Sequence, residues 1–328
     1  AKAMLDKKLV NVDIHQTDHI LYSEAVLFAD NDRVKVAIQD QHTNIILIEK
    51  NGKVIFEKEH DECADCDPYD IFKQVSAREI FEFSCEVELD KIRFIGQAAA
   101  LNRALSNEGL RENYGLHIGR TLRKQVGSGL MSDDLLSKIM IETTAASDAR
   151  MGGATLPAMS NSGSGNQGIA ATMPVVVVTD YLNVSEEKHL RALFLSHLMA
   201  IYIHSKLPKL SALCAVTTAS MGSCAGIAYL LTGKFETVSM GICSMIGDIS
   251  GIICDGASNS CAMKVSTSVA SGYKSVLMAM DETHVTGNEG IVEHDLDRTI
   301  DNLCSIASKS MHHIDRQVIE IMVSKPCP

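Results

Sequence analysis

Two long stretches of this 328-residue chain carry no charged side chain: residues 151–179 and 210–233. Runs of this length belong either in a protein core or in a membrane. The first contains Pro157, Pro174 and a cluster of Gly, Ser and Asn, which a lipid-exposed helix would not carry. The second is rich in Ser, Thr, Gly and Cys and lacks a flanking basic asymmetry and an aromatic belt. We therefore expect no membrane segment, and we predict that residues 210–231 form a buried helix.

The remaining patterns predict an α+β fold, with a small antiparallel sheet in residues 1–68 and a mostly α-helical domain in residues 69–328. Short β-branched runs alternate with turn signals up to residue 59, among them Asn51-Gly52, a strong hairpin signal. Beyond residue 69, apolar residues recur at helical spacing. The expected strands are residues 9–16, 21–29, 33–39, 44–49 and 53–57. The other expected helices are residues 69–83, 91–106, 116–125, 132–150, 185–206, 236–253, 263–280 and, as one kinked helix or two, 293–322.

Charge is unevenly divided between these two parts. Residues 1–90 carry 10 Lys and Arg against 20 Asp and Glu, whereas the rest of the chain carries 20 against 21. Neither part has a basic stripe, so we expect no nucleic-acid partner. The chain opens without a basic and apolar leader, so we expect a cytoplasmic protein. Its ten cysteines are then reduced, bound to metal or used chemically.

The region between residues 144 and 168 is rich in small residues and ends in Met-Ser-Asn-Ser-Gly-Ser-Gly-Asn-Gln-Gly. Small residues let the backbone approach a ligand closely, and successive N–H groups can form an anion-binding concavity. A carboxylate or a phosphate would suit such a loop. It lacks the Gly-Lys-Ser/Thr ending of a P-loop. A tight structural loop between two helices explains the same residues equally well.

Three cysteines lie beside irregular segments: Cys214, Cys254 and Cys261. Three thiolates can hold a [4Fe–4S] cluster and leave one iron open as a Lewis acid. Their spacing matches neither a ferredoxin nor a zinc finger, so by spacing alone inert core cysteines are the commoner interpretation. The pair Cys63 and Cys66 lies in an acidic segment with no second pair, and we take it as incidental.

Several polar residues interrupt apolar helical patterns. His197 and His204 are seven residues apart and share a helix face, and His117 and Asp248 stand in similar surroundings. Buried, hydrogen-bonded polar groups explain each of them singly. His197 and Lys206 are nevertheless the weak candidates for proton transfer.

Six blocks of sequence together resemble the L-cysteine desulfidase family, which is related to the α chain of iron–sulfur L-serine dehydratases. The resemblance extends over nearly the whole chain. The blocks are Thr43-Asn44-Ile45, Gly115-Leu-His-Ile-Gly119, Ser147-Asp-Ala-Arg-Met-Gly-Gly153, the run 159–168, Met245-Ile-Gly-Asp248, and Ile253-Cys-Asp-Gly-Ala257 with Cys261.

The resemblance implies a lyase with an oxygen-sensitive [4Fe–4S] cluster on Cys214, Cys254 and Cys261. The implied reaction is α,β-elimination on a small L-amino acid, either L-cysteine to pyruvate, ammonia and sulfide or L-serine to pyruvate and ammonia. We expect the substrate carboxylate on the 160–168 loop, at Ser162, Ser164 and Asn166, with Arg150 or His197 positioning the substrate. The expected partner is therefore the small-molecule amino acid, and the protein is a candidate homo-oligomer.

Members of this family begin with a further segment whose Gly-Cys-Thr-Glu-Pro motif carries the proposed catalytic base. That motif is absent from this sequence. We therefore leave the catalytic base unassigned and expect a fragment that lacks it. Two alternatives stay open: a non-catalytic amino-acid-binding or redox-sensing protein of the same fold, and a zinc protein that uses the same cysteines.

Overall fold

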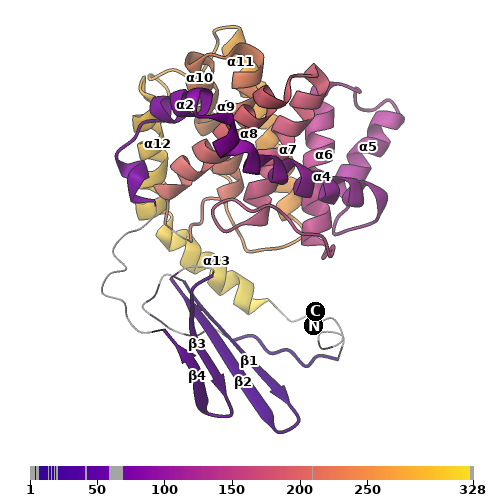
Figure 1. Cartoon of the computed structure of the whole chain (residues 1–328), viewed down its shortest axis with the longest axis vertical. Coiled ribbons are helices and arrows are strands. Elements are labelled where there is room, and N and C mark those ends of the chain that lie inside the picture. The colour runs from indigo at the N-terminus through magenta and orange to yellow at the C-terminus, as the bar shows by residue number, and fades with distance from the viewer. Residues whose placement is uncertain are drawn as a thin grey trace. The chain divides into compact units, whose positions relative to one another are not determined.

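The computed structural model describes residues 4, 7–13, 15, 17, 19, 21–40, 43–58, 69–208 and 210–325. The chain divides into two compact units, Ala1–Cys66 and Asp67–Pro328. The first contains a small sheet and the second a set of packed helices (Figure 1). The predicted α+β class is confirmed.

The sheet has four antiparallel strands in the order β1-β2-β3-β4. Tight turns set its register: Asn51 and Gly52, between the last two strands, both have positive φ (53° and 79°), as a two-residue hairpin turn requires. Ion pairs join neighbouring strands, Lys35 with Glu24 at 2.8 Å and Arg33 with Glu49 at 2.6 Å. The strands are β1 (Tyr22–Ala29), β2 (Asp32–Gln39), β3 (Ile45–Lys50) and β4 (Lys53–Glu57).

The strand predicted over residues 9–16 is wrong for the part that the structure describes. Residues 9–13 are irregular, although Val10 and Val12 alternate with polar residues as a strand would require. An extended segment becomes a strand only when a neighbour takes up its backbone hydrogen bonds. Among the described residues, β1 pairs with β2 alone, so these residues have no such neighbour.

Side-chain caps fix the starts of four helices in the helical unit. Ser76 forms a capping box with Glu79, and Asp134, Ser185 and Asp295 accept hydrogen bonds from the first turns of their helices. The helices are α2 (Ala77–Glu86), α3 (Leu89–Ile92), α4 (Gly96–Arg111), α5 (Ile118–Gly127), α6 (Leu135–Met151), α7 (Gly165–Leu182), α8 (Glu186–Ser205), α9 (Ala215–Thr232), α10 (Phe235–Ile249), α11 (Cys261–Met280), α12 (Leu296–Ser305) and α13 (His312–Ser324), with short turns η1 (Asp70–Lys73), η2 (Arg93–Ile95) and η3 (Ile306–Ser310).

Helix α9 is the predicted buried helix and packs against α7, α8, α10 and α11. It is the one described helix that is long and apolar enough to cross a membrane, but 78% of it is buried inside the protein. Small residues let its neighbours approach: a Cβ on Gly222 or Gly226 would lie less than 3.0 Å from the backbone carbonyl of Ser196 or Ala192 on α8. The burial fits a core helix of a globular unit.

Helix α7 was not predicted, and it fills the second half of the first uncharged stretch. Pro174 lies inside it and cannot donate the helical hydrogen bond to the carbonyl four residues earlier. The helix persists because almost every residue from Gly165 to Thr179 is buried between α4, α6, α8 and α9. Packing therefore overrides a local sequence that favours a break.

Replacing Gly222 by Ala tests this close packing. A glycine-to-alanine change inside a helix normally stabilises it by up to about 1 kcal/mol. Here the new methyl group would meet the Ser196 carbonyl and the Ala200 side chain, so we expect a loss of about 1–3 kcal/mol in the free energy of unfolding. The control is Gly127→Ala at the end of α5, where a Cβ meets nothing within 4 Å. Equal effects of the two changes in denaturant unfolding would contradict the packing.

Candidate active site

A short antiparallel contact brings two of the three candidate cysteines to one face. Leu213 pairs with Ile253, the backbone N–H of Cys214 donates to Ile252 at 2.9 Å, and that of Cys254 donates to Ala212 at 2.7 Å. Side chains alternate along a strand, so Cys214 and Cys254 both lie on the face opposite to that of Leu213 and Ile253. They are diagonal neighbours, for which the backbone separation is roughly 7–8 Å.

Cys261, the first residue of α11, is tied to the same loop. Its sulfur accepts a hydrogen bond from the backbone N–H of Ser258 at 3.4 Å and donates to the Gly256 carbonyl at 3.5 Å. One turn further along α11, Lys264 donates to the carbonyl of Ile253 at 2.8 Å and forms an ion pair with Asp255. These contacts fix the start of α11 against the segment that carries Cys254.

The chemistry of these cysteines suits a shared metal cluster. All three are free thiols; Cys214 is buried, whereas Cys254 and Cys261 are half-buried. Burial raises the pKa of the Cys214 thiol to about 11, against a hydrogen bond from the Val216 amide, so its thiolate needs a positive partner.

The three thiols are not arranged around a single metal ion. Among residues of the described ranges, no three His, Cys, Asp or Glu side chains lie close enough to hold one metal ion. A single ion holds every sulfur at about 2.3 Å and therefore draws the sulfurs together. Iron–sulfur clusters are likewise held by cysteine thiolates. The donor set, three free cysteines, is one that a four-iron cluster could use.

Arg150, near the end of α6, links the cysteines to the small-residue loop. A Cβ on Gly165, the first residue of α7, would lie less than 3.0 Å from the guanidinium, which therefore rests on the helix N-terminus. Burial lowers the pKa of Arg150, while attraction to the nearby Cys261 acts in the opposite direction. No ion pair joins it to any described carboxylate. Nη1 of Arg150 donates to the Met151 sulfur at 3.0 Å. A guanidinium without a described carboxylate partner and a helix N-terminus thus lie together, near enough to Cys261 for its charge to act on Arg150.

The predicted loop residues divide into two groups. Ser162 has φ +48°, and its hydroxyl donates to Asn161 at 2.9 Å; Ser164 caps α7 without a side-chain hydrogen bond to the helix. Both serines are half-buried. Asn166 is buried and accepts a hydrogen bond from Ser147 on α6 at 3.1 Å, so it holds α7 to α6. The two serines are therefore the more accessible contacts for an anion.

His197 supports this loop from beneath. Its Nδ1 lies 3.2 Å from the Asn161 amide, and its Nε2 lies 2.9 Å from the hydroxyl of Thr172, which itself donates to Gly168. Nε2 is then the protonated nitrogen, and Nδ1 accepts from Asn161. Burial lowers the pKa of His197 to about 4, so the ring is neutral. These contacts favour a role in positioning the loop over one in proton transfer.

Other predicted residues lie elsewhere. Lys206 forms an ion pair with Asp301 at 2.7 Å and covers the ring of Tyr202, so its contacts are with α8 and α12. Asp248 binds Ser271 and Lys274, each at 2.7 Å, and joins α10 to α11. His117 is exposed at the start of α5 with φ +44°. Cys63 and Cys66 lie outside the described residues.

Asp148 has a role that the sequence interpretation missed. It is buried on α6, where one oxygen accepts a hydrogen bond from the Gly119 amide at 2.8 Å and the other has no described partner. This holds the N-terminus of α5 against α6. The preceding turn reaches the cysteine loop, because a Cβ on Gly115 would lie 3.0 Å from Asn259. The available signal was an acidic residue within a run of Ala, Ser and Thr.

Residues 34–320 match the protein family described as serine dehydratase alpha chain. The chain belongs to this family. The relation to the serine dehydratase α chain, inferred from the sequence blocks, is thereby confirmed.

Three relatives are similar to this chain over nearly its whole length. A UPF0597 protein of Actinobacillus pleuropneumoniae serotype 3 is 70% identical over 329 residues, one of Dichelobacter nodosus 62% over 326, and UPF0597 protein YhaM of Escherichia coli O1:K1 57% over 328. Each alignment covers 99% of this chain and 75% of the relative. These names state no substrate and no cofactor.

The buried Asp148 predicts a pH-dependent stability. Burial, opposed by the amides of Gly119 and Ile118, raises its pKa from 3.8 to about 6, so the fold favours the protonated carboxyl. The stability that the fold gains from the protonated carboxyl is fully present below pH 3.8 and is lost as pH rises through about 6. Between pH 4 and pH 7, the unfolding free energy of the wild type should fall relative to Asp148→Asn by on the order of 2–3 kcal/mol.

The control for this titration is Asp133→Asn, which removes an exposed carboxylate of the same unit. Its unfolding free energy should follow the wild type across the range. Parallel profiles for the wild type and Asp148→Asn would show that the ionised carboxylate costs nothing in the fold.

Proposed function

We propose that this member of the serine dehydratase alpha-chain family is a lyase that catalyses α,β-elimination on a small L-amino acid. One observation carries the proposal: the Arg150 guanidinium lies against the N-terminus of α7, within the electrostatic influence of Cys261. A guanidinium that could hold a carboxylate therefore lies near one of the three free thiols. L-Cysteine and L-serine both carry the carboxylate that such a site would hold.

Cys214, Cys254 and Cys261 would hold a four-iron four-sulfur cluster. When bound, such a cluster supplies a Lewis acid, because three cysteines leave one iron without a protein ligand. The free thiols, the hydrogen bond from Ser258 and the link from Lys264 to Ile253 support this assignment. Loading would release the proton of Cys214, since only the thiolate is a ligand.

Arg150 would bind the substrate carboxylate through charge-assisted hydrogen bonds. The first N–H groups of α7 and the hydroxyls of Ser162 and Ser164 would complete its coordination. Asn161, His197 and Thr172 would keep this loop in place, because their hydrogen bonds join it to α7 and α8. The amino acid would thus be oriented by its carboxylate before any bond breaks.

The reaction requires that a base take the α-proton while the hydroxide or thiol group leaves Cβ. Water or hydrogen sulfide departs, and the remaining enamine tautomerises and is hydrolysed to pyruvate and ammonia. We assign the base to no residue of this chain. His197 is a poor choice because both of its ring nitrogens are already hydrogen-bonded.

Counting iron and sulfide after anaerobic reconstitution tests the cofactor assignment. We expect about four of each per chain in the wild type and a sharp loss in Cys254→Ala. The matched control is Cys85→Ala, which removes another half-buried thiol, on α2. No uptake of iron, or equal uptake by Cys254→Ala, would refute the cluster. Amino-acid binding without iron would then favour a non-catalytic sensor.

Substitution of Arg150 tests the carboxylate site independently of turnover. In Arg150→Gln, we expect the dissociation constant of L-serine, measured by calorimetry on reconstituted protein, to rise about 10- to 100-fold. Iron content should stay unchanged. Arg93→Gln, which removes an exposed arginine that pairs with Asp90, should leave serine binding unaltered. Serine affinity that survives the loss of Arg150 would place the carboxylate elsewhere.

A further inference from the structure

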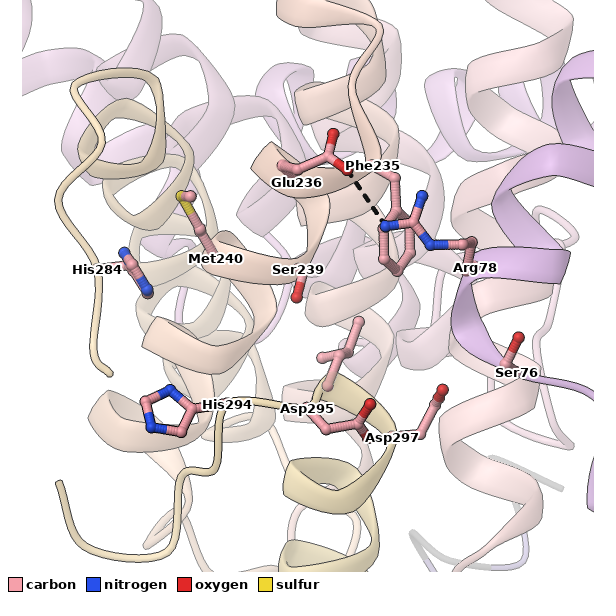
Figure 2. Close-up of a pocket in the computed structure, with 11 residues that line it drawn as sticks. Ser76, Arg78, Phe235, Glu236, Ser239, Met240, His284, His294, Asp295 and Asp297 are labelled. Carbon is pink, nitrogen blue, oxygen red and sulfur yellow. Dashed lines mark hydrogen bonds and ion pairs between the residues drawn. The ribbon is translucent and has the colours of Figure 1, made fainter. Parts of the chain in front are cut away.

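A cavity of about 460 Å³ lies in the helical unit, apart from the cysteines. Its walls come from the N-terminal ends of α2, α10 and α12 and from the loop that follows α11 (Figure 2). Helix α10 begins at the cavity with Phe235 and ends, 15 residues later, before the loop that carries Cys254. At 1.5 Å per residue, about 22 Å of helix separates the two places. The volume is in the range of small-molecule sites.

The charges of the cavity are unbalanced. Three carboxylates line it, those of Glu236, Asp295 and Asp297, against one guanidinium, that of Arg78. Arg78 is already occupied, because it pairs with Glu236 at 3.2 Å and lies 4.2 Å from the centre of the Phe235 ring (Figure 2). The two aspartates therefore give the cavity an excess of negative charge.

The N-termini of α12 and α2, which border the cavity, already have anionic partners. One oxygen of Asp295 accepts from the Arg298 amide of α12 at 2.8 Å. One oxygen of Asp297 accepts from the Ala77 amide of α2 at 3.0 Å and from the Tyr202 hydroxyl at 2.5 Å. The positive ends of these helices thus have anionic partners, and an added anion would meet net repulsion. A cation could use the second oxygen of each aspartate.

The rest of the lining favours an organic cation. Within the described ranges, no three potential ligands converge on a metal ion. Met240, Phe235 and Leu296 supply apolar surface beside the carboxylates. The Nδ1 of His284 is buried without a hydrogen-bond partner among the described residues, and an imidazole nitrogen can accept from an ammonium group.

We propose that this cavity binds a small organic cation, a primary amine on a short apolar chain, at a site distinct from the reaction site.

The proposal is tested with three five-carbon probes that differ only in the head group: n-pentylamine, pentanoate and 1-pentanol. Binding to the full chain is measured by calorimetry and by ligand-observed NMR. We expect n-pentylamine to bind, and pentanoate and pentanol to bind at least about tenfold more weakly, a difference of about 1.4 kcal/mol. Magnesium chloride should not compete.

Two variants locate the bound amine. Asp295→Asn removes a charge but keeps a side chain that caps a helix equally well, so the protein should remain folded. Glu236→Gln removes a second carboxylate from the wall. Each should weaken pentylamine binding by about tenfold, whereas Asp281→Asn, an exposed acid outside the cavity, should not. Absence of pentylamine binding, equal binding of pentanoate, or full affinity in Asp295→Asn would overturn the proposal.

Discussion

Contact between backbones at glycine residues holds the candidate active site together. A Cβ at Gly168 or Gly152 would lie less than 3.0 Å from the carbonyl of Met159 or the amide of Gly115, and one at Gly165 would collide with the Arg150 side chain. Because these three residues have no side chain, the start of α7 can lie against the loop and against Arg150. The end of α6 can likewise lie against the turn before α5. The candidate anion-binding region is therefore shaped by how closely the helices pack.

Close packing also explains why polar groups in this core have fixed roles. A buried polar atom is costly unless it is hydrogen-bonded, and His197, Asn161 and Thr172 satisfy one another. Asp148 is the opposite case, because one of its oxygens has no described partner and burial raises its pKa to about 6. Arg150 is similar, a half-buried cation without a described carboxylate. Buried ionisable groups without a full set of partners are common at sites where a ligand supplies the missing contact.

Much of the fold could be predicted from local pattern. The predicted Asn51-Gly52 turn leads into β4, which has the bounds predicted for it, 53–57. Helix α8 begins directly after Ser185, the first residue of the helix predicted there, which caps it. Helix α7 could not be predicted, since Pro174 and the glycines argue against a helix until burial is known. The strand expected at residues 9–16 failed because periodicity does not show whether a partner strand exists.

The site was only partly accessible to sequence reasoning. The cysteines are 40 and 7 residues apart, and nothing in that spacing reveals the antiparallel contact between Leu213 and Ile253 that places two of them on one face. The candidate anion-binding loop was visible in its small residues, and Arg150 was expected to position the substrate. The contact of its guanidinium with the first residue of α7 could not be read from the sequence. The sequence singled out His197 as a candidate for proton transfer, but its hydrogen bonds are those of a residue that holds the loop in place.

Mössbauer spectroscopy tests most directly whether the cysteines and the amino acid share one site. The protein would be reconstituted anaerobically with iron-57, and spectra taken before and after addition of L-serine or L-cysteine. We predict that one iron in four differs from the others and that only its signal shifts when the amino acid binds. Four equivalent irons, unchanged by either amino acid, would contradict a shared site.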